Sequence, residues 1–121
     1  MNITIWIIQG LIAAFFLVPG IRKAFFSKEK LIELKMLEAG APVAQQRFVG
    51  IAELLGVIGI IVPLLTGIVP ILTPLAASGL ALIMALAFAF HLNRKEYKML
   101  PLLAIVFLLA VVVAFYRFQT L

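Results

Sequence analysis

Three side chains at the ends of apolar runs have the types and spacing that could bind a polar group or move a proton. Glu53 is the only ionisable side chain in residues 48–90. Lys23 and His91 stand at the ends of two other apolar runs. An isolated carboxylate at the centre of a bilayer costs roughly 3 kcal/mol, so such a residue usually has a partner and often a function.

The segment that follows His91 adds Arg94 and Glu96 to the candidate set. One His and no Cys leave no usual ligand set for zinc, haem or an iron–sulfur cluster, and no glycine-rich phosphate loop is present. We therefore expect no metal site and no cofactor within the chain. The nearest approach to a catalytic group is Glu53 with His91, as proton donor and acceptor, so the sequence favours a protein without catalytic activity of its own.

A structural interpretation of the same residues stays open beside the chemical one. Glu53 could form a buried ion pair with Lys23 or Arg22 that fixes the order of the helices. His91 could form a hydrogen bond with Glu96 or with a carbonyl group. Lys23, Glu53 and His91 come from three different helices and can converge at one membrane depth, where they would bind a polar head group.

The composition places these residues in a membrane protein. The 121 residues are 65% hydrophobic and 12% charged, whereas a soluble domain is about half apolar and a quarter charged. A soluble domain of this size buries only about two thirds of its surface and could not hide so many apolar residues. The sequence therefore predicts a single transmembrane domain over residues 1–121.

Four segments have the length and apolar character of membrane spans, at about 20 residues per crossing. They are residues 3–21, 48–65, 74–90 and 100–118. Four crossings cannot close a β-barrel, and open sheet edges are not tolerated in lipid. We expect an all-α integral membrane four-helix bundle.

Local signals refine this prediction. Residues 25–38 favour an additional cytoplasmic or interfacial helix between the first two spans, with Ser27 as its N-cap. Thr73 and Pro74 suggest the N-cap and first turn of the third span. Gly50 and Gly56 lie on the same helical face as Glu53 and favour close packing of a neighbouring helix.

The remaining polar side chains of the spans are few. Gln9 is expected to form a hydrogen bond between helices. Ser78 and Thr73 are the other polar groups on the outer side of the membrane. The fourth span is plain, with Arg117 expected at the outer interface and no chemical role.

Lys and Arg side chains predict the orientation, because basic loops stay in the cytoplasm. They gather after the first span (Arg22, Lys23, Lys28, Lys30, Lys35 and Arg47) and after the third (Arg94, Lys95 and Lys98). Both termini should therefore face outward. The net charge of +5 is explained by topology, and nucleic-acid binding is not indicated.

Several short motifs, in order, resemble the DoxX-like family of small four-helix membrane proteins. They are Pro19-Gly20-Ile21-x-Lys23, Phe48-x-Gly50-x-x-Glu53-Leu54-Leu55-Gly56-x-x-Gly59-x-x-x-Pro63, Leu72-Thr73-Pro74-Leu75-Ala76-Ala77-x-Gly79-Leu80, and His91 with Arg94 and Glu96. The chain departs from the pattern near Lys95, where a Gly is expected. The resemblance implies a multi-pass protein of the bacterial cytoplasmic (inner) membrane.

Three functions remain as hypotheses. The resemblance favours a non-enzymatic membrane subunit or anchor linked to quinone or redox metabolism or oxidant defence, with a redox protein as its partner. The residues allow a binding protein or enzyme for a quinone, isoprenoid or lipid at a Lys23, Glu53 and His91 cluster. A small proton-coupled carrier is the weaker alternative. Self-association through the small-residue faces would fit any of them.

Overall fold

The computed structural model describes residues 2–120, and every regular element in that range is helical. The elements are α1 (Asn2–Phe25), α2 (Lys28–Glu33), α3 (Val43–Thr66), α4 (Leu72–Asn93), a 3₁₀ turn η1 (Tyr97–Met99) and α5 (Leu100–Thr120). Four helical segments are long and apolar enough to cross a membrane: α1, α3, α4, and η1 together with α5. The prediction of four helices with the length and apolar character of membrane spans is confirmed.

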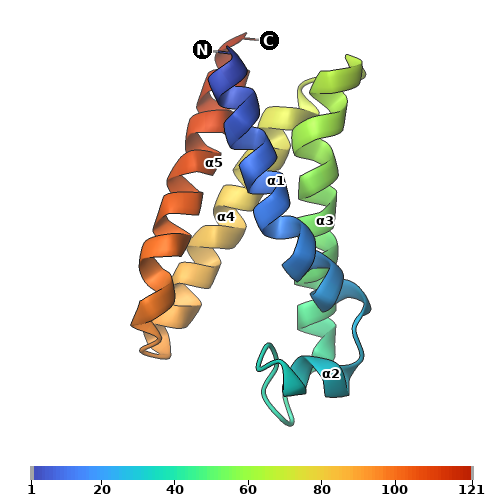
Figure 1. The fold of residues 1–121 in the computed structure, drawn as a ribbon, viewed down its shortest axis with the longest axis vertical. Helices are drawn as coiled ribbons and strands as arrows, with labels where there is room; N and C mark the ends of the chain where they lie inside the picture. The colour runs from blue at the N-terminus through green and yellow to red at the C-terminus, as the bar shows by residue number, and fades with distance from the viewer. Residues whose placement is uncertain (1, 121) are drawn as a thin grey trace.

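The four long helices form a bundle in which α1 lies next to α5 at one end and next to α3 at the other (Figure 1). Both chain ends lie together at what we call the terminal end, and α2 and the α4–α5 connection lie at the opposite, loop end (Figure 1). The main packing runs from α1 to α3, from α3 to α4 and from α4 to α5. Helices α1 and α5 meet at the terminal end and diverge toward the loop end (Figure 1).

The core is a narrow column of apolar side chains between the helices. Ile5, Phe16, Ile60, Leu80 and Val113 are among its fully buried members. In the most apolar window of each spanning helix, only 22% to 28% of the residues are buried inside the bundle. The remaining apolar side chains face outward, and a contiguous apolar surface of that extent requires lipid around it.

The helices α1 and α3 extend beyond the predicted spans, and neither internal proline ends its helix. Pro19 lies inside α1, which continues to Phe25, and Pro63 lies buried inside α3. A proline within a helix leaves the carbonyl four residues earlier without its usual N–H donor. For Pro63 this carbonyl belongs to Gly59, and the Thr73 hydroxyl donates to it at 3.1 Å.

That contact also corrects the role predicted for Thr73. Helix α4 begins at Leu72 with Ile71 in the N-cap position, so Thr73 lies inside the first turn and is not the N-cap. Its hydroxyl instead joins α4 to α3 at Gly59. In an apolar bundle, a carbonyl without a donor is costly, so the Thr73 hydroxyl stabilises the bundle more by donating to Gly59 than by capping the first turn of α4.

The helix predicted over residues 25–38 is shorter than expected. Ser27 is its N-cap, as predicted, and accepts a hydrogen bond from the Lys30 N–H at 3.1 Å. The helix ends at Glu33 because the chain reverses in a Schellman turn, with Lys35 in the left-handed conformation (φ 61°). Helix α4 ends in the same kind of turn, with Lys95 in the left-handed conformation (φ 60°), near the position where the resemblance led us to expect a Gly.

Candidate functional site

Glu53 and Lys23 form a buried ion pair between α3 and α1. Lys23 Nζ lies 2.8 Å from Glu53 Oε1. The Glu53 side chain is 2% exposed and the Lys23 side chain 23% exposed, so the pair is closed on the Glu53 side and reaches solvent or lipid only through the lysine. Of the two cations considered as partners for Glu53, Lys23 and Arg22, Lys23 is the one that pairs with it, and the carboxylate already has its counter-ion.

Small residues let the two backbones approach closely enough for this pair to form. A Cβ added at Gly50 would lie 2.6 Å from Ala24 N and 2.6 Å from Lys23 Cβ. A Cβ added at Gly56 would lie 2.5 Å from Leu80 Cδ2 on α4. The close packing predicted for the Glu53 face of the helix is confirmed, and it leaves no room for a ligand beside these glycines.

The end of α1 next to the pair is fixed by a second basic side chain. Arg47 Nη1 donates to the carbonyl oxygen of Lys23 at 3.1 Å, which supplies a donor to the last turn of α1. Gln46 Nε2 donates to the Met36 carbonyl at 2.6 Å and ties the loop after α2 to α3. The polar groups around Glu53 therefore act together to hold α1, α3 and the intervening loop.

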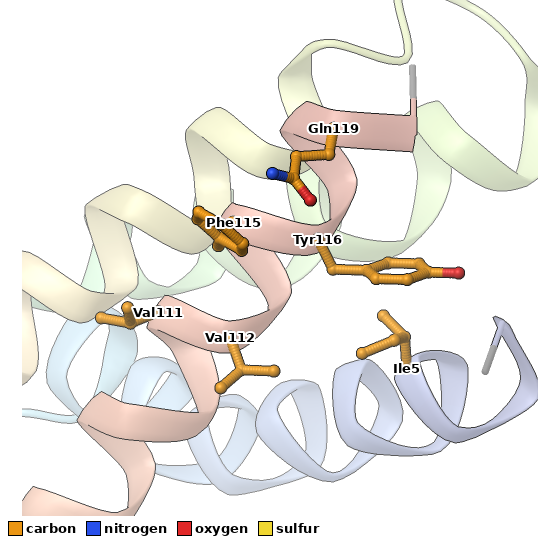
Figure 2. A pocket seen from close by; sticks show the side chains of 6 residues that line it. All are labelled: Ile5, Val111, Val112, Phe115, Tyr116 and Gln119. Carbon is orange, nitrogen blue, oxygen red and sulfur yellow. The ribbon is translucent and has the colours of Figure 1, made fainter.

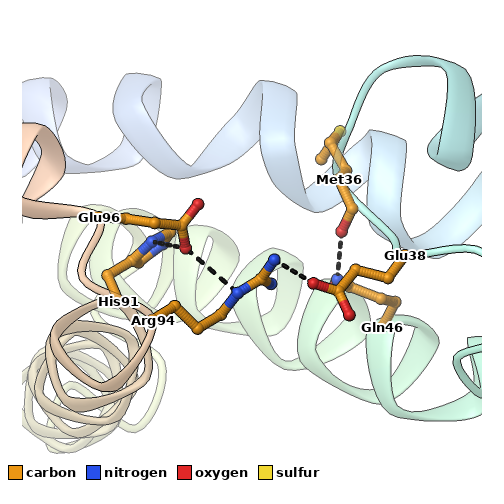
Figure 3. Close-up of polar contacts among 6 residues, drawn as sticks. All are labelled: Met36, Glu38, Gln46, His91, Arg94 and Glu96. Carbon is orange, nitrogen blue, oxygen red and sulfur yellow. Dashed lines mark hydrogen bonds and ion pairs between the residues drawn. The ribbon is translucent and has the colours of Figure 1, made fainter.

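His91, Arg94 and Glu96 form a separate group, which we call the loop-end cluster together with Glu38. His91 Nδ1 lies 3.1 Å from Glu96 Oε1, and Arg94 Nε lies 3.5 Å from the same oxygen. Arg94 also pairs with Glu38 in the loop before α3. Figure 3 shows this chain of contacts running from His91 through Glu96 and Arg94 to Glu38.

The candidate residues thus divide between two groups. Within residues 2–120, no hydrogen bond or ion pair joins Lys23 and Glu53 to His91, Arg94 or Glu96. The expected hydrogen bond between His91 and Glu96 is present. Binding of a polar head group by Lys23, Glu53 and His91 together stays a prediction.

The polar groups considered for a carrier path are used in contacts within the bundle. Ser78 Oγ donates to the Pro74 carbonyl at 2.8 Å, and Thr73 donates to Gly59. Gln9 Nε2 donates to the Ile60 carbonyl at 2.6 Å. Each of these side chains therefore donates a hydrogen bond to a backbone carbonyl of the bundle. Transport stays a prediction.

The comparison with known protein families finds a match to the DoxX-like family over residues 7–114. The chain belongs to the DoxX-like family. The match to this family, together with four spanning helices, makes it a multi-pass membrane protein. Comparisons with curated proteins and with solved structures gave no match.

The structure also shows a site in this DoxX-like protein that the sequence reasoning missed. Arg117 was expected at the outer interface of a plain helix, but it is 4% exposed. Arg117 Nε donates to Gln9 Oε1 at 2.8 Å, and Arg117 Nη1 donates to Asn2 Oδ1 at 2.7 Å. We call Asn2, Gln9 and Arg117 the terminal-end cluster.

A signal for the burial of Arg117 was present in the sequence. Val106, Ala110 and Val113 are the buried face of α5, and Arg117 continues this face at helical spacing. Placing Arg117 by its distance from the chain end alone ignored the direction of its side chain. Gln9 lies within the residues that match the DoxX-like family, whereas Arg117 lies after them.

Proposed function

We propose that this DoxX-like protein is a non-enzymatic membrane subunit or anchor for a redox protein that works in quinone metabolism or oxidant defence. The observation that carries the proposal is the ion pair of Glu53 with Lys23. The one carboxylate within the spanning helices that could have served as a proton donor or acceptor is buried against its counter-ion, in contact with close-packed backbone. Such a pair orders helices, which is what an anchor requires.

The loop end supplies the surface on which a partner would bind. Arg22, Lys28, Lys30, Lys95 and Lys98 are exposed there. A basic surface next to the spanning helices attracts acidic protein surfaces as well as anionic lipid head groups. The loop-end cluster holds the two connections of this end together through Arg94 and Glu38, so the surface is presented as one unit.

The experiment is cross-linking of the full chain in its native membrane, followed by purification in mild detergent. We expect a co-purified protein that carries a flavin, haem or iron–sulfur absorbance, since this chain has no Cys and one His. Replacing Lys95 and Lys98 by Gln should reduce its recovery. The matched control, Gln119→Glu with Thr120→Glu, changes the net charge equally at the terminal end and should leave recovery unchanged.

Two outcomes would contradict the proposal. The first is a cross-linked preparation that contains no redox protein. The second is a purified chain that oxidises or reduces a quinone without any other protein present.

A further inference from the structure

Arg117 is a buried cation whose hydrogen-bond partners among residues 2–120 are all neutral. Its two contacts are to the side-chain oxygens of Gln9 and Asn2. The ion pairs among residues 2–120 involve Lys23, Lys30, His91 and Arg94, and none involves Arg117. Taking a guanidinium out of water without an opposite charge is costly, so the site is electrostatically incomplete.

One nitrogen of the same guanidinium has no hydrogen-bond partner. Arg117 Nη2 is fully buried and unpaired among the described residues. A guanidinium presents its donors in a planar fork that matches the oxygens of a phosphate or carboxylate group. Nε and Nη1 of Arg117 already donate to Gln9 and Asn2, so Nη2 is the nitrogen that could donate to an oxyanion.

Two aromatic rings cover the guanidinium. Arg117 Cζ lies 5.3 Å from the centre of the Trp6 ring and 5.4 Å from the centre of the Tyr116 ring. Tyr116 is half-buried and also lines an apolar groove of about 380 Å³. Its ring therefore lies both next to the Arg117 guanidinium and in the wall of the groove.

The groove runs along the outer surface between α1 and α5. Its other lining residues are Ile5, Val111, Val112, Phe115 and Gln119. Figure 2 shows Ile5 on α1 facing Tyr116 on α5, with the valines and Phe115 continuing along α5 away from the chain end. A groove of this shape and lining accommodates an acyl chain next to a polar head.

We propose that the terminal end of the bundle binds an anionic phospholipid. Its head group accepts hydrogen bonds from Arg117, and one acyl chain lies in the groove lined by Ile5, Val112 and Phe115. The positive charge of Arg117 selects a net anionic lipid, because a zwitterionic lipid would bring its own cation next to the guanidinium. The Tyr116 ring turns aside to admit the head group.

Trp6, the single Trp of the chain, reports on this site because it stacks on Arg117. The full chain is reconstituted into nanodiscs that contain phosphatidylglycerol and phosphatidylcholine, with bromine on the acyl chains of one lipid or the other. Bromine quenches Trp fluorescence at short range. We expect binding to phosphatidylglycerol to be favoured by about tenfold, because both lipids offer a phosphate but only phosphatidylcholine brings a second cation next to Arg117.

Two variants remove separate parts of the site. Arg117→Gln removes the charge, and Val112→Phe fills the groove without touching Arg117; both should abolish the preference. Val62→Phe, at an exposed position of α3 that does not line the groove, makes the same change elsewhere and should retain it. If Arg117→Gln does not fold, the comparison of Val112→Phe with Val62→Phe still decides.

Three results would overturn the proposal. One is equal quenching of the wild type by the two brominated lipids. Another is a preference that survives in Val112→Phe or in folded Arg117→Gln. The last is inorganic phosphate that changes the Trp6 emission in neutral detergent as much as phosphatidylglycerol does, because the site would then be one for a free anion.

Discussion

Glu53 depends on Lys23 more than Lys23 depends on Glu53. The carboxylate is 2% exposed and has one charged partner, whereas the lysine side chain is 23% exposed and keeps partial access to its surroundings. A buried ion pair contributes little net stability relative to apolar side chains of the same shape. Removing only one partner is different, because an uncompensated charge is left inside the bundle.

This asymmetry gives a prediction for the ion pair. Lys23→Met should lower the free energy of unfolding by about 3 to 5 kcal/mol, since it leaves Glu53 buried and unpaired. The double variant Lys23→Met with Glu53→Gln should recover a large part of that loss, because no charge remains to be buried. Reversible unfolding in mixed detergent micelles measures both values.

An exposed ion pair supplies the control. Lys30 and Glu33 lie 3.8 Å apart with side chains 49% and 72% exposed, so Lys30→Met should change the unfolding free energy by less than about 1 kcal/mol. Equal stability of Lys23→Met and the double variant would contradict the cost of an uncompensated charge at Glu53, because removing that charge would then recover nothing.

The contacts of single residues were predictable where one strong constraint acted on them. Glu53 in an apolar run needed a cation, and Lys23 at the end of the preceding span was the nearest in depth. The contact of Arg117 with Gln9 joins residues more than a hundred positions apart. It depends on α1 and α5 meeting at the terminal end, which no local pattern determines.

At the scale of the elements, the contact of α1 with α3 is set by glycine. Gly50 faces backbone atoms of Ala24 and Gly20, which cannot move aside as a flexible side chain can. The ion pair of Lys23 with Glu53 lies on the same face of α3, one turn further along. The separation of the two helices and the geometry of the pair therefore depend on the same position.

A substitution at Gly50 tests this dependence. Gly50→Ala should lower the free energy of unfolding by about 1 to 3 kcal/mol, because the added methyl group would overlap the backbone of α1. Gly79→Ala is the matched control, since nothing lies within 4 Å of the added Cβ and the position is helical and exposed. It should be neutral or stabilising by up to about 1 kcal/mol. Equal effects of the two substitutions would contradict the close contact.

The limits of the elements were harder to predict than their number. Residue composition is enough to count four apolar helices, but the ends depend on contacts made elsewhere. Thr73 supplies the carbonyl freed by Pro63 with a donor, and this bond between two helices let α3 continue through a residue that ends most helices. In the same way, Lys35 shows that a charged residue can take the left-handed position usually held by Gly.

At the scale of the whole molecule, positive charge is separated from one end of the bundle to the other. Both chain ends lie at the terminal end, and α2 and the α4–α5 connection lie at the loop end (Figure 1). Nine of the ten Lys and Arg residues belong to the last turn of α1, the segments around α2, the first turns of α3 or the α4–α5 connection. The tenth, Arg117, is buried at the terminal end.

This separation predicts the orientation in the membrane, because basic segments next to spanning helices resist translocation. At either terminus, a reporter domain that works only outside the cytoplasm should be active, and one that works only in the cytoplasm should be inactive. A reporter inserted between α3 and α4, near Gly67, should behave in the same way, whereas one inserted near Lys95 should require the cytoplasm. Replacing Arg117 by Gln should leave all four results unchanged, because removing a positive charge from the terminal end strengthens the existing bias.

A terminal reporter that is active in the cytoplasm would show that the positive charges do not set the orientation. The basic surface of the loop end would then face away from any cytoplasmic partner.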